Sequence, residues 1–119
     1  MSIESQIQAR GLTAARVTPD DIEANIASEH YFTAYEGYLG AAPKPGRYDP
    51  EVDPASLDTL KLLSFCVLVL RNGFTVTGES ACVSPENYDR EIGLAIARKN
   101  AVEKIWPLMG YALKEQVAQ

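Results

Sequence analysis

The stretch LKLLSFCVLVLRNGFTVTG, residues 60–78, decides how this chain folds. Its apolar run ends in Asn-Gly, and a second run of strand-forming residues follows at once. Asn and Gly both tolerate the positive φ angles of a tight turn, so the pair predicts a β-hairpin. A two-residue turn would place Val69 opposite Val76 and Val67 opposite Gly78. Because the first strand is apolar on both faces, it should be buried or central, and Gly78 indicates a bulge or a close backbone approach.

A long helical region is predicted after the hairpin, over residues 85–117. Ser84 can cap it and Pro85 suits the first helical position, although Asn87 could serve as the cap instead. Pro107 lacks the N–H that a helix interior requires, so a kink or break is expected there. An apolar stripe runs along this region and comprises Ile92, Ile96, Val102, Ile105, Trp106, Met109 and Leu113.

This helical region is too long for a small core. About thirty helical residues would span about 45 Å, whereas a compact chain of this size has a radius of gyration of about 13–14 Å. Either Pro107 folds the helix back, or the helix packs against a second copy. We expect Trp106, Met109 and Leu113 to form the dimer interface. The alternative is that the stripe only covers the protein's own sheet.

The remaining organisation indicates one domain over residues 1–119. Residues 1–36 form an N-terminal helix and strand region, with a helix over 19–28 that begins at Thr18-Pro19 and strand character over 31–35. The Pro- and Gly-rich residues 37–55 read as a surface loop or a lid, and the hairpin occupies 60–83. The predicted fold class is therefore α+β, with a small antiparallel sheet followed by a long, Pro-interrupted C-terminal helix that packs in a homodimer.

Composition excludes several classes of protein. The 119 residues, with 46% apolar and 23% charged side chains, suit one globular domain. No apolar run is long enough to span a membrane, and the first residues do not resemble a signal peptide. The cysteines, Cys66 and Cys82, fit buried thiols of a reducing compartment, and with the single His30 they make no zinc-type spacing, so neither metal nor cofactor is expected. The net charge of −5 argues against duplex nucleic acid as a partner.

The second half of the chain resembles a family of small tailed-phage proteins. The resemblance covers about residues 60–116, and residues 31–34 match more loosely. It is carried by Leu70–Val83, Asn87–Asp89, Glu91–Gly93, Ala97–Val102, Ile105–Pro107 and Gly110–Tyr111. The architecture is also similar to the Thoeris anti-defence sponge proteins of phages. These bind and sequester cyclic ADP-ribose-type signals made by bacterial TIR enzymes, and some also hold cyclic oligonucleotides.

The resemblance implies a non-enzymatic homo-oligomer, a dimer or a hexamer, that binds a cyclic nucleotide in the host cytoplasm. Such a ligand needs an aromatic plate for its base, cations for its pyrophosphate and amides for its ribose hydroxyls. The candidates for these ligand-binding roles are Tyr88 (or Tyr31) as the plate, Arg90, Arg98 and Lys114 as the cations, and Asn87 and Asn100 as the amides.

Each candidate also has a structural interpretation. Arg90 could pair with Glu86 one helical turn earlier, and Arg98 shares a helix face with Glu91. Tyr88 could pin the helix start onto the hairpin, and Lys114 could complement the helix dipole. A different function is also open, in which the acidic surface inhibits a host enzyme by binding it. Catalysis by Asp/Glu pairs is not expected, because the sequence indicates no pairing of a nucleophile with a general base.

Overall fold

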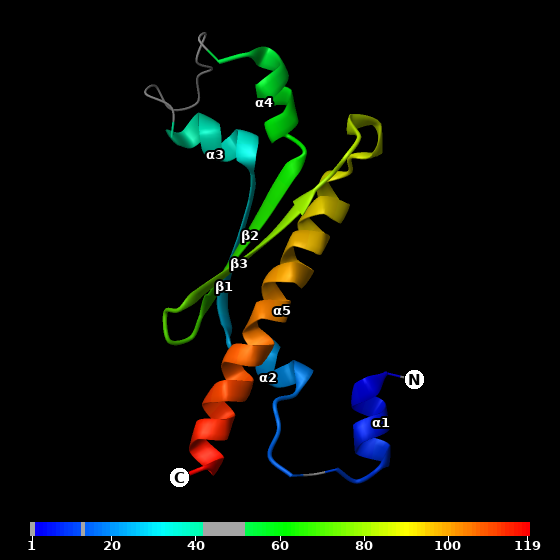
Figure 1. Cartoon of the computed structure of the whole chain (residues 1–119), viewed down its shortest axis with the longest axis vertical. Coiled ribbons are helices and arrows are strands. Elements are labelled where there is room, and N and C mark those ends of the chain that lie inside the picture. Colours follow the sequence, from blue (N-terminus) through cyan, green and yellow to red (C-terminus); the bar gives the residue numbers. More distant parts are fainter. Residues whose placement is uncertain (1, 13, 42–51) are drawn as a thin grey trace.

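A three-stranded antiparallel sheet in the order β1-β2-β3 forms the centre of the chain. The computed structural model describes residues 2–12, 14–41 and 52–119. Figure 1 shows the long helix α5 lying across the sheet, with short helices at both ends, which confirms the predicted α+β class. The elements are α1 (Ile3–Ala9), α2 (Pro19–Ala24), β1 (Ile26–Thr33), α3 (Ala34–Ala41), α4 (Pro54–Leu60), β2 (Leu63–Leu70), β3 (Thr75–Ala81), the 3₁₀ turn η1 (Pro85–Asn87) and α5 (Arg90–Val117).

The predicted hairpin is present as β2 and β3, but its register differs from the expectation. The loop has three residues, because the Leu70 N–H donates to the Phe74 carbonyl oxygen at 2.8 Å. Gly73 takes the third loop position with a φ of 90°, which only Gly adopts without strain. Val76 therefore lies opposite Leu68, and the predicted pairs Val69–Val76 and Val67–Gly78 are wrong by one residue.

The core lies between the sheet and α5. Alternate residues of β2 are buried against the helix, while the others are half-buried on the opposite face, which confirms that this strand is central. The helix contributes small residues at a spacing of four, so its backbone comes close to the sheet. The core cluster comprises Ile22, Cys66, Leu68, Leu70, Val76, Ala97, Ala101 and Ile105.

Strand β1 begins earlier than the aromatic run suggested, and helix α2 ends earlier. The predicted helix over 19–28 stops at Ala24, and the strand covers Ile26–Thr33 instead of residues 31–35. Thr33 ends the strand because it caps α3: its hydroxyl accepts from the Glu36 N–H at 3.1 Å, and its own N–H donates to the Glu36 carboxylate at 3.0 Å. Of the predicted loop over 37–55, residues 42–51 lie outside the described residues.

Helix α5 is one continuous helix from Arg90 to Val117, so the expected break at Pro107 does not occur. A proline fits helical φ, and here its missing N–H removes the bond to the carbonyl of Glu103, an exposed residue. The helix begins at neither Ser84 nor Asn87. Asp89 is the cap, since its carboxylate accepts from the Ile92 N–H at 3.0 Å.

The length of α5 gives the molecule an elongated shape. Its 28 residues span about 42 Å, which is longer than the strands beneath it. The radius of gyration is 18.9 Å, well above the radius of about 13–14 Å that is typical of a compact chain of this length. The principal extents are 60 × 32 × 17 Å. The helix thus outruns the sheet, as the sequence indicates, and the homodimer stays a prediction.

Candidate functional site

A cavity of about 220 Å³ lies where the end of β3, the following loop and the first turns of α5 meet. It contains two of the predicted ligand-binding residues, Asn87 and Tyr88, which are neighbours in the loop before the helix. Its wall is mostly apolar, with polar groups gathered on the loop. The full lining is Leu62, Ser80, Ala81, Cys82, Asn87, Tyr88, Asp89, Ile92, Gly93 and Ile96.

The loop sequence shapes this cavity. Pro85–Asn87 forms a 3₁₀ turn, and Asp89 then starts α5, so Tyr88 is extended between two helical segments. The thiol of Cys82 donates to the carbonyl oxygen of Ser84 at 3.2 Å, which holds the start of the loop. The loop is therefore fixed at both ends, and the cavity wall is preorganised.

Gly93 and Ser64 form the base of this region. A Cβ on Gly93 would stand 2.9 Å from the Ser64 hydroxyl oxygen, so a larger residue would force this hydroxyl to turn aside. The Ser64 hydroxyl is buried and has no hydrogen-bond partner among the described residues. An unpaired buried hydroxyl is uncommon and is destabilising unless something binds it. It marks this end of the sheet as a place where a further polar group would be stabilising.

Arg90 follows the cavity residues and is held by an ion pair. One terminal nitrogen of its guanidinium donates to the Glu36 carboxylate at 2.8 Å, and both side chains are about half exposed. This hydrogen bond holds the pKa of Glu36 below its ordinary value. The predicted pairing with Glu86 is replaced by this contact with α3, and Arg90, which does not line the cavity, remains half exposed.

Arg98 and Asn100 have structural partners in this chain. Arg98 donates to the Glu23 carboxylate at 2.7 and 3.1 Å and to Glu29 at 2.6 Å, so it ties α2 and β1 to α5. The Asn100 amide donates to the carbonyl oxygen of Glu79 in β3 at 2.8 Å. Neither residue lines the cavity that contains Tyr88.

Lys114 lies at the far end of α5 from Arg90. The two residues are 24 positions apart, which is about 36 Å along a helix axis. Within one chain, the structure therefore places Asn87 and Tyr88 in one cavity, with Arg90 two residues further along the sequence and bound to Glu36, and leaves Lys114 apart. A single site that contains all the predicted ligand groups would need a second copy.

The predicted interface residues lie in the second half of α5. Trp106 is 37% exposed. Met109 is partly buried and packs against the core of its own chain, and Leu113 is half-buried beside a second cavity. Part of the apolar stripe thus covers the chain's own core, and Trp106 remains available for an outside contact.

That second cavity, of about 470 Å³, was not foreseen from the sequence. It lies between α2, the hairpin loop and the end of α5, and two of its residues are arginines, Arg16 and Arg71. Its members come from positions as far apart as Arg16 and Gln116, so no local pattern could have indicated it. The lining is Arg16, Val17, Asp21, Ala24, Asn25, Arg71, Met109, Ala112, Leu113 and Gln116.

Two searches of the described residues bear on other kinds of function. Among residues 2–12, 14–41 and 52–119, no three His, Cys, Asp or Glu side chains are grouped so that they could hold a metal ion. None of the helices in this part of the chain is long and apolar enough to cross a membrane.

The fold and cavity define a small α+β protein in which a long helix crosses a three-stranded sheet beside a partly enclosed pocket. The chain belongs to the phage protein (N4 Gp49/phage Sf6 gene 66) family, whose model matches residues 17–117. The resemblance to a small phage protein family is therefore confirmed. Searches of curated proteins and of solved structures find no match.

Proposed function

We propose that this phage protein binds and sequesters a cyclic nucleotide immune signal in the host cytoplasm without cleaving it. The expected ligands are the cyclic ADP-ribose isomers made by Thoeris TIR enzymes, and cyclic oligonucleotides are a further possibility. The observation that carries the proposal is the preorganised cavity that places Tyr88 and Asn87 together just before α5; Arg90, two residues after Tyr88, supplies a half-exposed guanidinium.

The dimensions of the cavity suit part of such a ligand. Its volume of about 220 Å³ is below the roughly 300–1,000 Å³ of sites that enclose a whole small molecule. One base can enter against the Tyr88 ring, where stacking contributes about 1–3 kcal/mol. The pyrophosphate then lies at the surface, where Arg90 can exchange its Glu36 partner for a phosphate oxygen.

A second copy would complete the site. If two α5 helices pair in an antiparallel manner around residue 104, Lys114 of each copy lies opposite Leu94 of the other, which is one turn from Arg90. This arrangement adds a cation where the single chain has a half-open pocket. It also buries Trp106 near the centre of the helix pair, consistent with the unusual length of α5.

The test is ligand retention. Purified protein is incubated with each cyclic ADP-ribose isomer, freed of unbound ligand, and heated to release what it holds. We expect an unchanged ligand at a fixed ratio to protein, and at least a tenfold lower yield from Tyr88→Ala. Tyr111→Ala is the matched control, because Tyr111 is 71% exposed at the other end of α5. If no isomer is retained, the proposal is wrong, and a chemically altered ligand would show an enzyme.

A second candidate function is inhibition of a host enzyme by direct binding. The observation that favours it is a pair of exposed apolar side chains: Ile92, which lines the cavity, is 61% exposed, and Val83, which follows the lining residue Cys82, is 96% exposed. Exposed apolar surface often marks a protein contact. Co-purification of one host protein with the wild-type chain, lost in Val83→Asp, would support this function over sequestration.

A further inference from the structure

Helix α1 depends on something outside its own sequence for stability. It has seven residues, is described throughout, and buries none of its side chains. Figure 1 shows it standing away from the sheet and α5. Isolated helices shorter than about 12–15 residues are marginal in water, even with good caps such as Ser2, whose hydroxyl accepts from the Ser5 N–H at 3.1 Å. The helix therefore needs a packing partner.

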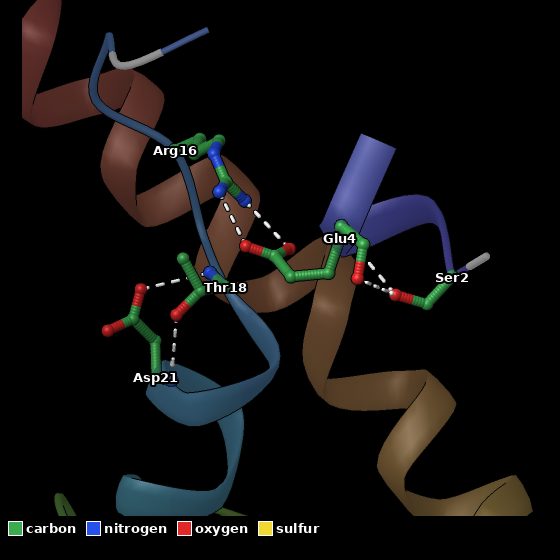
Figure 2. A network of polar contacts seen from close by, with 6 residues as sticks. Ser2, Glu4, Arg16, Thr18 and Asp21 are labelled. Atoms are coloured by element: carbon green, nitrogen blue, oxygen red, sulfur yellow. Dashed lines mark hydrogen bonds and ion pairs between the residues drawn. The ribbon is translucent and has the colours of Figure 1, made fainter. Parts of the chain in front are cut away.

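The N-terminal arm, residues 2–12, is tied to its own chain by an ion pair. Figure 2 shows the Arg16 guanidinium facing the Glu4 carboxylate with two parallel contacts, one of them 2.9 Å. This hydrogen bond lowers the pKa of Glu4. Arg16 is presented by a fixed turn, because Thr18 and Asp21 next to it form a capping box. The ion pair directs the arm without burying its apolar side chains.

The apolar side chains of the arm are covered only in part by its own chain. Ile3 is 76% exposed, and Ile7, four residues later, lies on the same helix face and is half-buried. Leu12 follows, also exposed. The arm is thus an amphipathic segment with one carboxylate, Glu4, one guanidinium, Arg10, and an apolar face that its own chain covers only in part.

The second cavity has the complementary chemistry. Its lining includes three apolar side chains, Val17, Met109 and Leu113, which form what we call the apolar floor, and two arginines, Arg16 and Arg71, which form the arginine rim. The one carboxylate of the lining, Asp21, already accepts a hydrogen bond from the Thr18 N–H at 2.9 Å. Arg71 is held in place, since its Nε donates to the Ala24 carbonyl oxygen at 2.8 Å. An apolar floor beside two guanidinium groups fits a ligand that has apolar side chains next to a carboxylate.

We propose that the N-terminal arm of one copy docks into this cavity of a second copy, with Ile3 and Ile7 on the apolar floor and Glu4 against the arginine rim. Each copy carries both an arm and a cavity, so the exchange is reciprocal and needs no other partner. The ion pair that Glu4 makes with Arg16 is kept, and the apolar face of α1 becomes buried. The family match begins at Val17, so the arm lies outside the part of the chain shared with the family.

The deciding experiment mixes two complementary charge variants of the full chain. Glu4→Arg places two arginines at this contact in one copy, and Arg16→Glu places two glutamates there. Each variant alone should self-associate at least tenfold more weakly than wild type in sedimentation velocity. A mixture should recover association, because position 4 of one variant then pairs with position 16 of the other in both directions. If mixing gives no recovery, the contact is confined within one chain and the proposal is wrong.

A second pair of variants tests the apolar part of the contact. The double variant Ile3→Asp with Ile7→Asp should also weaken association at least tenfold, whereas Val83→Asp, an exposed apolar position remote from the arm, should not. Equal association of the arm variant and wild type would overturn the proposal. The arm contact and the proposed nucleotide site both require a second copy of the chain, but the arm contact requires no nucleotide. If the wild type retains nucleotide and the arm variants associate as strongly as the wild type, the arm contact alone is refuted.

Discussion

Gly78 of β3 lies directly beneath Ala97 of α5, so close that a methyl group on Gly78 would stand 2.1 Å from the Ala97 carbonyl oxygen. The same methyl group would be 2.3 Å from the Ala101 nitrogen. Both neighbours are helix backbone, which cannot turn aside as a flexible side chain can. The absence of a side chain at one strand position therefore sets how closely the helix packs on the sheet.

We predict that Gly78→Ala lowers the free energy of unfolding by about 3 kcal/mol, at the upper end of the range for overpacked cores. The helix has to lift from the strand, which loosens the contacts of Ala97 and Ala101 as well. Urea denaturation followed by circular dichroism measures the loss.

Gly40→Ala is the matched control for this prediction. Gly40 lies in α3, and a methyl group there meets no described atom within 4 Å. It should leave the stability unchanged or raise it by up to about 1 kcal/mol, because Ala favours helix over Gly. Equal effects of the two substitutions would mean that α5 does not approach β3 as closely as the structure places it.

The hairpin shows what a single sequence can and cannot determine. The apolar run over residues 60–70 and the Asn72-Gly73 pair identified both strands, because turn chemistry and hydrophobicity are local properties. The register was missed by one residue, since Gly73 suits both the second position of a two-residue turn and the third of a three-residue loop. Only the hydrogen bond between Leu70 and Phe74 distinguishes the two cases.

The candidate site was predictable only where its residues are neighbours along the chain. Asn87 and Tyr88 are adjacent, and both line the same cavity. Arg98 binds the carboxylates of Glu29 and Glu23, which lie 69 and 75 positions earlier in the sequence, and helix periodicity cannot indicate such a pairing. The start of α5 was missed because Ser84, Asn87 and Asp89 are all residue types that cap helices well. The 3₁₀ turn occupies residues 85–87, so Asp89 is the residue that caps α5.

Arg98 should make the stability of the chain depend on acid pH. Its hydrogen bond is the main cause that lowers the pKa of Glu29, so the unfolded chain takes up this proton at a higher pH than the folded chain. The stabilisation is complete above the unfolded carboxyl pKa of about 4.3. It is lost as the pH falls through the lowered folded value, because the unfolded state then binds more protons.

We therefore predict two effects of Arg98→Gln. At pH 7 the free energy of unfolding falls by about 1–2 kcal/mol, as hydrogen bonds to charged groups are removed. Between about pH 5 and 3 the variant loses less further stability than wild type. Arg90→Gln, which breaks one contact between half-exposed groups, should change stability by less than about 1 kcal/mol. Parallel pH profiles for wild type and Arg98→Gln would contradict the role assigned to Arg98.

Pro107 should lower the stability of α5 even though the helix continues through it. Restoring an N–H at this position lets it donate to the carbonyl of Glu103 and removes the ring from the preceding turn. We expect Pro107→Ala to raise the free energy of unfolding by about 1–3 kcal/mol, measured by urea denaturation. Pro19→Ala provides the comparison, since Pro19 is the first residue of α2, where no N–H is needed, and little gain is expected. A loss of stability in Pro107→Ala would indicate that the proline ring itself packs against something.

Trp106 offers a direct optical test of helix pairing, because it is the chain's single tryptophan and its fluorescence therefore has one source. In one copy the side chain is 37% exposed, although its neighbour Ile105 is fully buried in the core. If two helices pair there, dilution should expose the indole, and the emission maximum should shift to longer wavelength across the same concentrations at which sedimentation shows dissociation. Trp106→Asp should dissociate at concentrations at which the wild type is still dimeric, yet keep its circular dichroism spectrum, because the side chain is not part of the core cluster. An emission maximum that stays constant while the particle remains at 13.0 kDa would refute the helix-paired dimer and with it the completed nucleotide site.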